Sequence, residues 1–140
     1  MAIIQGLQRD GSRPYADIAK EIGLEEGAVR KRVRDLMEHE VVQIVAVTDP
    51  LQLGFRQRAM VGIRTDGNPT TVARALSQFR DICYVVTTAG SADVLAEIVC
   101  GGDSELLDIL TERIRALGGV RSVEMFVYLK QNKRRYQGER

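Results

Sequence analysis

The apolar positions of residues 1–40 recur at the spacing of short helices. They fall into three groups: Ile3, Ile4 and Leu7; then Tyr15, Ile18, Ala19 and Ile22; then Val29, Val33, Leu36 and Met37. Each group lies on one face of a helix, because neighbours on a helical face are three or four residues apart. Gly23 ends the second group. We predict three short helices that pack around one shared apolar cluster.

The apolar period changes after the third group. Residues 42–47 form a largely β-branched run, which predicts a strand. Asp49-Pro50 and Gly54 then mark a turn or linker. We therefore predict a helix-turn-helix domain at residues 1–48, a linker at 49–56 and a second domain at 57–140.

The second domain contains the order strand–helix–strand twice. In the first copy, strands are predicted at 59–65 and 82–88. Asn68 is expected to cap the helix between them, with Pro69 at its first position. The apolar face of this helix comprises Val72, Ala75, Leu76 and Phe79.

The second copy repeats this order with strands at 94–100 and 120–129. Asp103 or Ser104 is expected to cap its helix, and the pair Gly118-Gly119 to end it. The buried stripe of this helix comprises Leu106, Leu107, Leu110, Ile114 and Leu117.

Together these elements predict an α+β protein. A three-helix, winged-type helix-turn-helix domain comes first, and a ferredoxin-like βαββαβ domain follows it. Two helices would cover one face of the four-stranded sheet and leave the other face exposed and apolar. Such a face usually finds a partner, so we expect a dimer that forms through the sheet.

Composition narrows the functional classes. The 140 residues are 44% hydrophobic and 28% charged, with a net charge of +1. A protein that coats nucleic acid in bulk would be strongly basic, so any nucleic-acid site must be a local patch. No signal pattern or membrane-length apolar run occurs, and we expect a cytoplasmic protein. Cys83 and Cys100 lack metal-ligand spacing, which predicts buried, reduced thiols.

The spacing between Arg13 and Leu36 is typical of a helix-turn-helix. Ala19 is small where two helices would cross, and Gly23 permits the positive φ that a tight turn needs. The second helix carries a basic side opposite its apolar stripe, as a recognition helix in the major groove requires. The alternative interpretation, a merely solvated basic face, does not account for this spacing.

Individual roles in DNA binding follow from position along that helix, since its N-terminal part enters the groove. We expect four residues near base edges: Gly27, Ala28, Lys31 and Arg32. Three others are expected to contact phosphates: Arg13, Arg30 and Arg34.

The chain also resembles a known family. The segments RPYADIAKEIGLEEGAVRKRVRDLMEHEVV, VTDPLQLGF, TTAGSADVLAEIV and GGVRSVEMFVYL are similar to the Lrp/AsnC (feast/famine) regulators. The resemblance implies a homodimer, often assembled into tetramers or octamers, that binds promoter DNA and responds to an amino acid. It also implies an effector site between dimers near a Gly-x-x-Asp loop, whose motif positions here are Gly90 and Asp93.

The chemistry of that loop is compatible with an amino-acid ligand. Its small residues, Thr88, Ala89, Gly90, Ser91 and Ala92, would expose backbone N–H groups that can hold a carboxylate. Asp93 could receive an ammonium group or cap the loop. The alternative is a simple Gly-containing hairpin in which Asp93 bonds its own backbone.

The sequence departs from the family pattern at four places. Glu25 stands where Ser or Thr usually caps the recognition helix, which predicts weaker or more salt-dependent DNA binding. Glu40 replaces the Gly that ends this helix, so a less sharp exit turn is expected. Ala92 replaces an aromatic residue and opens space beside the loop. Family members often have several residues ahead of the first helix, which is expected to be short here.

Other chemistries find little support. His39 is the single histidine and is expected at the surface or as a helix cap, so neither a metal site nor a catalytic triad is predicted. We expect no cofactor and no enzymatic activity. Two alternatives remain: a sensor or assembly module with weakened DNA binding, and a sirohaem decarboxylase-like enzyme.

Overall fold

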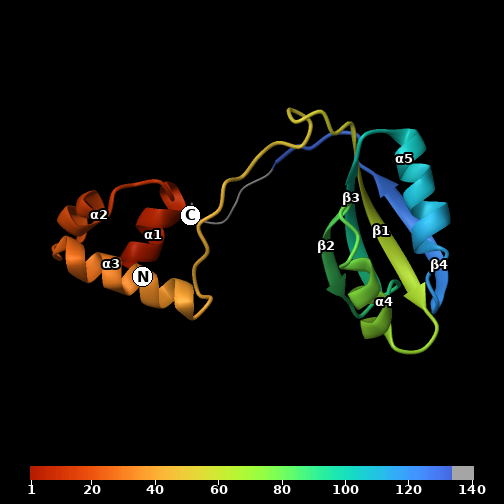
Figure 1. Cartoon of the computed structure of the whole chain (residues 1–140), viewed down its shortest axis with the longest axis horizontal. Helices are drawn as coiled ribbons and strands as arrows, with labels where there is room; N and C mark the ends of the chain where they lie inside the picture. Colours follow the sequence, from red (N-terminus) through yellow and green to blue (C-terminus); the bar gives the residue numbers. More distant parts are fainter. Residues whose placement is uncertain (134–140) are drawn as a thin grey trace. The chain divides into compact units, whose positions relative to one another are not determined.

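The structure is a computed structural model that describes residues 1–133, and the chain forms two compact units (Figure 1). One contains Met1–Val47 and the other Thr48–Asn132. Each has its own hydrophobic core. Residues 134–140, the end of the second predicted domain, lie outside the described residues.

The first unit contains three helices: α1 (Ala2–Arg9), α2 (Tyr15–Ile22) and α3 (Glu26–Glu38). Apolar side chains from all three helices share one buried cluster, which comprises Ile3, Leu7, Ile18, Ala19, Val29 and Val33. Every member belongs to a predicted apolar group, so the three-helix arrangement is confirmed.

The strand predicted at 42–47 is not formed. Val42 packs against the helical core, while Val41, Val45 and Val47 are exposed. A strand needs a neighbour that accepts and donates its backbone hydrogen bonds, and no strand pairs with this segment within residues 1–133. The β-branched composition therefore does not make a strand in the single chain.

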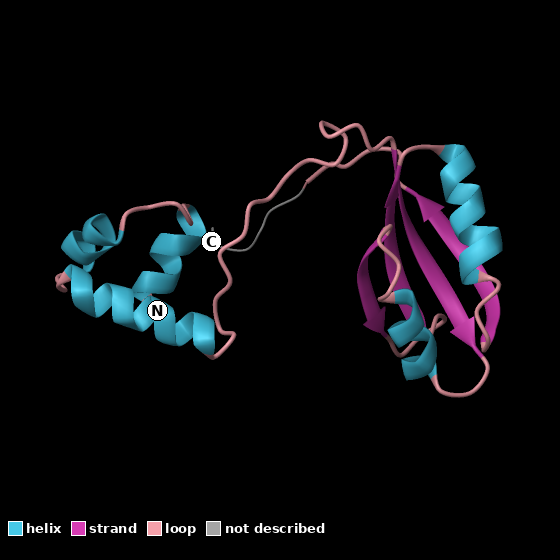
Figure 2. Ribbon diagram, viewed as in Figure 1, coloured by secondary structure: helices cyan, strands magenta, loops and turns pink. Residues whose placement is uncertain are grey.

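The second unit contains a four-stranded sheet. Its strands are β1 (Gln57–Thr65), β2 (Ile82–Thr87), β3 (Val94–Cys100) and β4 (Val120–Val127). All neighbours are antiparallel in the order β2-β3-β1-β4, which places β1 and β3 in the centre (Figure 2).

The helices pack on one face of this sheet. They are α4 (Pro69–Leu76) and α5 (Asp103–Asp108), and a π-helical turn at Ile109–Ile114 extends the latter. The core alternates along the strands, with Val61 and Ala96 buried on the helical side. The chain order βαββαβ confirms the ferredoxin-like prediction.

Helix starts were predicted with mixed success. Asn68 caps α4, and its side chain accepts a hydrogen bond from the Thr70 N–H at 2.9 Å. The prediction for α5 was wrong, because its N-cap is Gly102 rather than Asp103 or Ser104. Glu105 instead reaches back and accepts from the Gly101 N–H at 2.6 Å. Its carboxylate thereby ties the first turn of α5 to the residue before the N-cap, while no side chain caps the helix.

Candidate nucleic-acid interface and effector loop

Gly23 forms the turn between α2 and α3. It has φ 70° and ψ 33°, and its N–H donates to the Ala19 carbonyl. The Leu24 N–H donates to the same carbonyl at 3.0 Å. A side chain is strained in this left-handed conformation, which explains why glycine stands at the corner. The helix-turn-helix expected from the spacing is confirmed.

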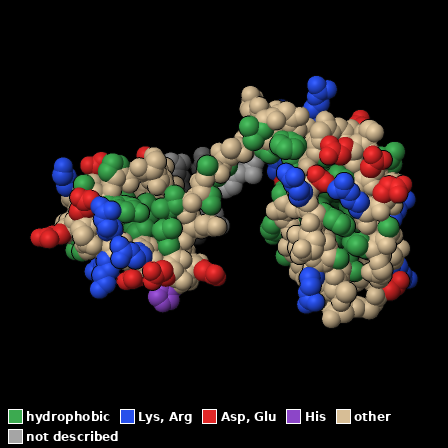
Figure 3. Space-filling model, in the orientation of Figure 1, with side chains coloured by type: hydrophobic (Ala, Val, Ile, Leu, Met, Phe, Trp, Pro, Cys, Tyr) green, Lys and Arg blue, Asp and Glu red, His purple; other side chains and the backbone are tan. Residues whose placement is uncertain are grey.

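Helix α3 has one buried and one exposed face. Val29 and Val33 are buried in the shared core. Gly27, Lys31 and Arg34 are exposed and lie on the opposite side, as the helical period requires. Nothing lies within 4 Å of the place where a Cβ on Gly27 would be. Figure 3 shows Lys and Arg side chains gathered over α3, with acidic side chains beside them. The exposed face therefore carries small residues near its N-terminal end and basic residues in its middle.

The remaining predicted DNA contacts on α3 lie along the edges of this face. Ala28 is exposed and lies beside Lys31 on the same side of the helix. Arg32 lies on one flank, where it lines a groove between the start of α1 and the end of α3. Arg30 lies on the other flank, and its guanidinium stands 5.5 Å from the centre of the Tyr15 ring.

Two of the predicted phosphate contacts are engaged in ion pairs. Arg30 is 2.6 Å from Glu26, one helical turn earlier. Arg13 is 2.6 Å from Glu21 on α2. The Arg30–Glu26 pair is about half exposed, and Arg13 is 27% exposed beside the more exposed Glu21, so each pair is accessible to solvent, weak, and able to open when a phosphate competes. The charge of Glu26 is balanced within the unit, which leaves Glu25 as the acidic residue at the start of α3 without a cation partner in the described chain.

The start and end of α3 are both unusual. Glu25 occupies the N-cap position in extended conformation, and its side chain makes no capping hydrogen bond. Glu40 adopts φ 56°, the left-handed conformation usually taken by glycine. The Val41 N–H then donates to the Leu36 carbonyl at 2.8 Å. The expectation of a less sharp exit turn was therefore wrong, because Glu40 accepts the strained conformation. His39 is the C-cap residue, as expected.

The predicted effector loop connects β2 to β3. The Thr88 N–H donates to the Asp93 carbonyl at 2.8 Å, and the Thr88 hydroxyl donates to the Ala92 carbonyl at 2.8 Å. Arg64 on β1 donates from Nε to the Ser91 carbonyl at 2.6 Å. These bonds fix the loop by its carbonyl groups. The backbone N–H groups from Ala89 to Ala92 make no hydrogen bond within the described residues.

Asp93 joins this loop to the end of β1. Its Oδ2 accepts from the Thr65 N–H at 2.8 Å and from the Thr65 hydroxyl at 3.3 Å. Its own N–H donates to the Ile63 carbonyl at 2.9 Å. The interpretation in which Asp93 bonds only its own loop is therefore wrong. Oδ1 has no hydrogen bond within residues 1–133, which leaves one carboxylate oxygen as an acceptor.

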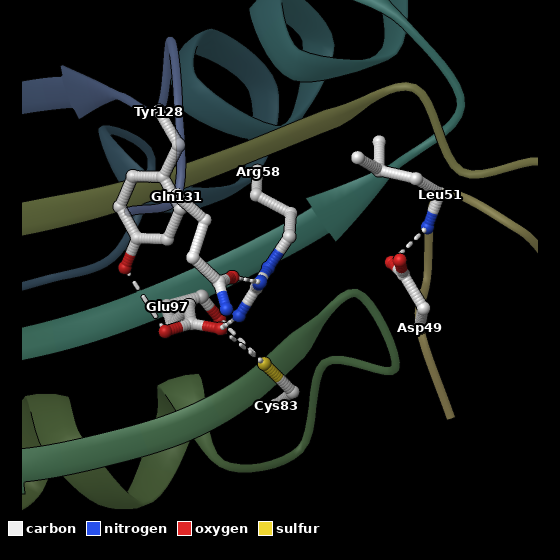
Figure 4. A network of polar contacts seen from close by, with 7 residues as sticks. All are labelled: Asp49, Leu51, Arg58, Cys83, Glu97, Tyr128 and Gln131. Carbon is white, nitrogen blue, oxygen red and sulfur yellow. Dashed lines mark hydrogen bonds and ion pairs between the residues drawn. The ribbon is translucent and has the colours of Figure 1, made fainter. Parts of the chain in front are cut away.

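The sheet face opposite the helices carries a polar cluster that the sequence analysis did not predict (Figure 4). Arg58 on β1 and Glu97 on β3 form an ion pair at 2.5 Å, with side chains only 12% and 18% exposed. The Tyr128 hydroxyl donates to Glu97 Oε2 at 2.9 Å, and Arg58 Nη1 donates to Gln131 Oε1 at 3.0 Å. Cys83 Sγ lies 3.6 Å from Glu97 Oε1. The open face was expected to be apolar, and this polar cluster corrects that expectation.

The cluster shifts the pKa values of its members. Burial alone would raise the pKa of Glu97, but hydrogen bonds from Arg58 and Tyr128 and the charge of Arg58 outweigh it, so this pKa is lowered. Burial, followed by the hydrogen bond to Glu97, raises the pKa of Tyr128 to about 12. Burial and the charge of Glu97 also raise the pKa of Cys83. The protonated thiol and phenol stand beside one carboxylate that remains charged.

Strand alternation could have indicated this cluster. Arg58 and Glu97 both lie out of phase with the buried positions of their strands, so both point to the open face. Cys83 was expected to be buried, but a register shift between Ile82 and Tyr84 brings it to the open face, where it is exposed. Cys100 is buried as expected, and both thiols are free.

A helix-turn-helix unit with a basic exposed helix, followed by a ferredoxin-like unit, defines a class of DNA-binding regulators. Comparisons with known proteins give the same class. Residues 1–37 match the AsnC-type helix-turn-helix domain, and residues 55–139 match a family described as a C-terminal dimeric alpha+beta barrel domain. The HTH-type transcriptional regulator FL11 of Pyrococcus abyssi is 31% identical over 133 residues, which cover 94% of this chain and 87% of that protein.

Solved structures share the fold. E. coli AsnC superposes with a TM-score of 0.88 at 18% identity, over 99% of this chain and 95% of that chain. The transcriptional regulator NMB0573 of Neisseria meningitidis, solved as a complex with L-Met, gives a TM-score of 0.86 at 16% identity, over 96% and 90%. At these identities the likeness shows the fold alone.

The chain belongs to the Lrp/AsnC family of helix-turn-helix transcriptional regulators. Its relatives are named as regulators, so it is not an enzyme, and the decarboxylase alternative is not supported. Within residues 1–133, no helix has the length and apolar character to cross a membrane. The same residues contain no group of three or more His, Cys, Asp or Glu side chains placed to hold a metal ion.

Proposed function

We propose that this chain is a homodimeric, sequence-specific DNA-binding regulator in the cytoplasm, controlled by an amino acid. The observation that carries the proposal is the exposed face of α3, where Gly27 leaves an open surface beside the basic side chains of Lys31 and Arg34. The small residue near the N-terminal end of α3 lets this helix approach base edges, and the basic side chains further along it reach bases and phosphates.

The division of roles follows the position of each residue around α3. Gly27, Ala28 and Lys31 face base edges, with Arg32 on the adjoining flank. Arg34 contacts a phosphate directly, whereas Arg13 and Arg30 do so after exchanging Glu21 and Glu26 for phosphate oxygens. A two-fold dimer places two such helices in successive major grooves. In this proposal the DNA-binding domain comprises residues 1–48, residues 49–56 are the linker, and residues 57–140 form the sensing and assembly domain.

The effector site in this proposal is the loop from Thr88 to Asp93. The N–H groups from Ala89 to Ala92 have no internal partner in the described chain, and backbone donors of this kind bind carboxylates. Oδ1 of Asp93 remains available for an ammonium group. A carboxylate and an ammonium on one small ligand describe an amino acid. The Neisseria regulator that shares this fold was solved as a complex with L-Met, which supports this ligand class.

The assembly in this proposal is a dimer that covers the open sheet face. Tyr84 and Phe126 are 53% and 51% exposed on that face, which is unusual for large aromatic side chains. The family description of the second domain as dimeric supports the same arrangement. Further assembly into tetramers or octamers would bring effector loops of neighbouring dimers together. The effector then acts only if it binds two arrangements of the assembly unequally.

Fluorescence anisotropy tests the DNA-binding half. The full chain is titrated against the duplex upstream of its own gene and against a scrambled duplex, with each amino acid added in turn. Tighter binding to the native duplex, shifted by one amino acid, supports the proposal. Equal or absent binding to both duplexes at moderate salt contradicts regulation from that site. It favours the alternative, a sensor with weakened DNA binding, which the missing capping hydrogen bond at Glu25 would support.

Asp93→Asn tests the effector half. An amide oxygen can still accept from Thr65, so the loop keeps its anchor while the negative charge is removed. The amino acid that shifts DNA binding should bind this variant at least about tenfold more weakly by calorimetry, because a charge-assisted hydrogen bond is lost. DNA binding without effector should stay unchanged. Unaltered ligand affinity would place the ammonium contact elsewhere.

A further inference from the structure

The open sheet face carries an ion pair on its two central strands, with large apolar side chains beside it. The register aligns Tyr84, Glu97, Met60 and Phe126 in one row across the four strands. In the adjacent row Val99 pairs with Arg58, and the Tyr128 N–H donates to the Arg58 carbonyl. The ion pair thus spans the two central strands, with aromatic and aliphatic side chains around it.

The ion pair is already partly withdrawn from water in the single chain. Arg58 and Glu97 are 12% and 18% exposed, and the Arg58 guanidinium lies against the Tyr128 ring, 5.3 Å from its centre. Arg58 Nε is buried and has no hydrogen-bond partner within the described residues. Tyr128 and Gln131 hold the two ends of the pair. The orientation of the pair is therefore fixed before any partner arrives.

A fixed, poorly hydrated ion pair makes a face selective. A wholly apolar face binds many apolar surfaces about equally well, because the hydrophobic effect has no direction. A buried pair adds little net affinity, but it penalises a partner whose charges do not complement it. The Arg58–Glu97 pair is fixed and poorly hydrated, and a partner that covers the open sheet face contacts it.

We propose that the Arg58–Glu97 pair selects a second copy of this chain as the partner on the open sheet face, in preference to chains that lack the pair or carry it reversed. This inference rests on the dimer of the proposed function and adds the residues that decide its specificity. Two sheets stacked face to face lie about 10 Å apart, so the pairs of two copies are close enough to interact with little screening.

Symmetry gives the proposal a sharp test. In a two-fold dimer, the interaction between the two pairs is a sum over products of one charge from each copy. Exchanging both charges in both copies leaves every product unchanged. Exchanging them in only one copy reverses every product. The variant Arg58→Glu/Glu97→Arg should therefore pair with itself and reject the wild type.

The experiment uses full-length chains, one with a mass tag, produced together in equal amounts and measured by native mass spectrometry. Tagged and untagged wild type should give about one half heterodimer, as random pairing requires. Wild type with the exchanged variant should give less than about one tenth. Tyr128 and Gln131 each carry a donor and an acceptor, so they can bond either orientation, and circular dichroism checks that the variant folds.

A second variant keeps the test decisive if the exchanged pair does not fold. Arg58→Met/Glu97→Leu should still form homodimers, since a buried pair can be replaced by apolar groups without loss of stability. The fraction of heterodimer between this variant and wild type should fall below about one half, because the ion pair of the wild-type copy is then buried against a copy that has no ion pair. Random mixing of the folded variants with wild type overturns the inference and leaves the dimer intact. A wild-type protein that stays monomeric overturns the inference and the proposed dimer together.

Discussion

Replacing Arg34 by Ala should lower the salt dependence of DNA binding. The proposed function assigns three phosphate contacts to each copy: Arg34 directly, and Arg13 and Arg30 once their ion pairs with Glu21 and Glu26 open. If each releases the counterion of one phosphate, a dimer makes about six such contacts. The logarithm of affinity should then fall with the logarithm of salt with a slope of roughly −5.4. From 50 to 200 mM salt, this slope corresponds to a loss of about a thousandfold.

The substitution removes one of these contacts from each copy. With two contacts fewer per dimer the slope should weaken by about 1.8, from roughly −5.4 to roughly −3.6, and the loss of affinity over the same salt range should become about tenfold smaller. Arg34 is exposed, so its replacement should change stability by no more than about 0.5 kcal/mol. Any change in the slope can then be assigned to DNA contact rather than to unfolding.

Anisotropy titrations at several salt concentrations measure the slope for the wild type and two variants. The matched control is Arg74→Ala, which removes an exposed arginine from α4 in the other unit. The control should keep the wild-type slope. Equal slopes for Arg34→Ala and Arg74→Ala would refute the assignment of the exposed face of α3 as the DNA interface.

Four further outcomes test particular contacts. Glu25→Ser should supply the missing N-cap of α3 and raise the free energy of unfolding, measured with denaturant, by about 1 kcal/mol. Glu40→Gly should relieve the left-handed strain and stabilise the first unit by about 1 kcal/mol; a lower melting temperature would contradict this. Asp93→Ala should destabilise the second unit by about 1–3 kcal/mol in denaturant unfolding, because the Thr65 donors lose their acceptor. Tyr128 should ionise near its pKa of about 12 in an absorbance titration, and Tyr128→Phe should remove that component. Because folding raises this pKa, its contribution to stability is complete below pH 10, the usual pKa, and is lost as pH rises towards 12.

Contacts between residues close in sequence could be predicted well. Asn68 and Pro69 determine the start of α4 through groups at most a few residues away, and the structure has the cap as expected. Gly23 likewise forms its turn with its immediate neighbours. The Gly102 cap was missed because two neighbouring acceptors competed. Asp103 accepts from Gln57 on β1, and Glu105 serves the backbone instead.

Three further failed predictions depend on residues far away in the chain. The run at 42–47 has the composition of a strand, yet no neighbour pairs with it within the described residues. Cys83 reaches the open face because the register of β2 against β3 shifts beside it. The partner of Asp93 is 28 positions away, so loop chemistry alone pointed to the wrong bond.

By itself, the sequence determined the helices, most strands, the helix-turn-helix corner and the family. These depend on periodicity and on glycine, proline and capping residues, whose effects extend over a few positions. Only the tertiary structure decided that Arg58 meets Glu97, 39 positions later, on the two central strands of the open face. Strand register sets which residues lie opposite each other, and register results from the packing of the whole sheet against its helices.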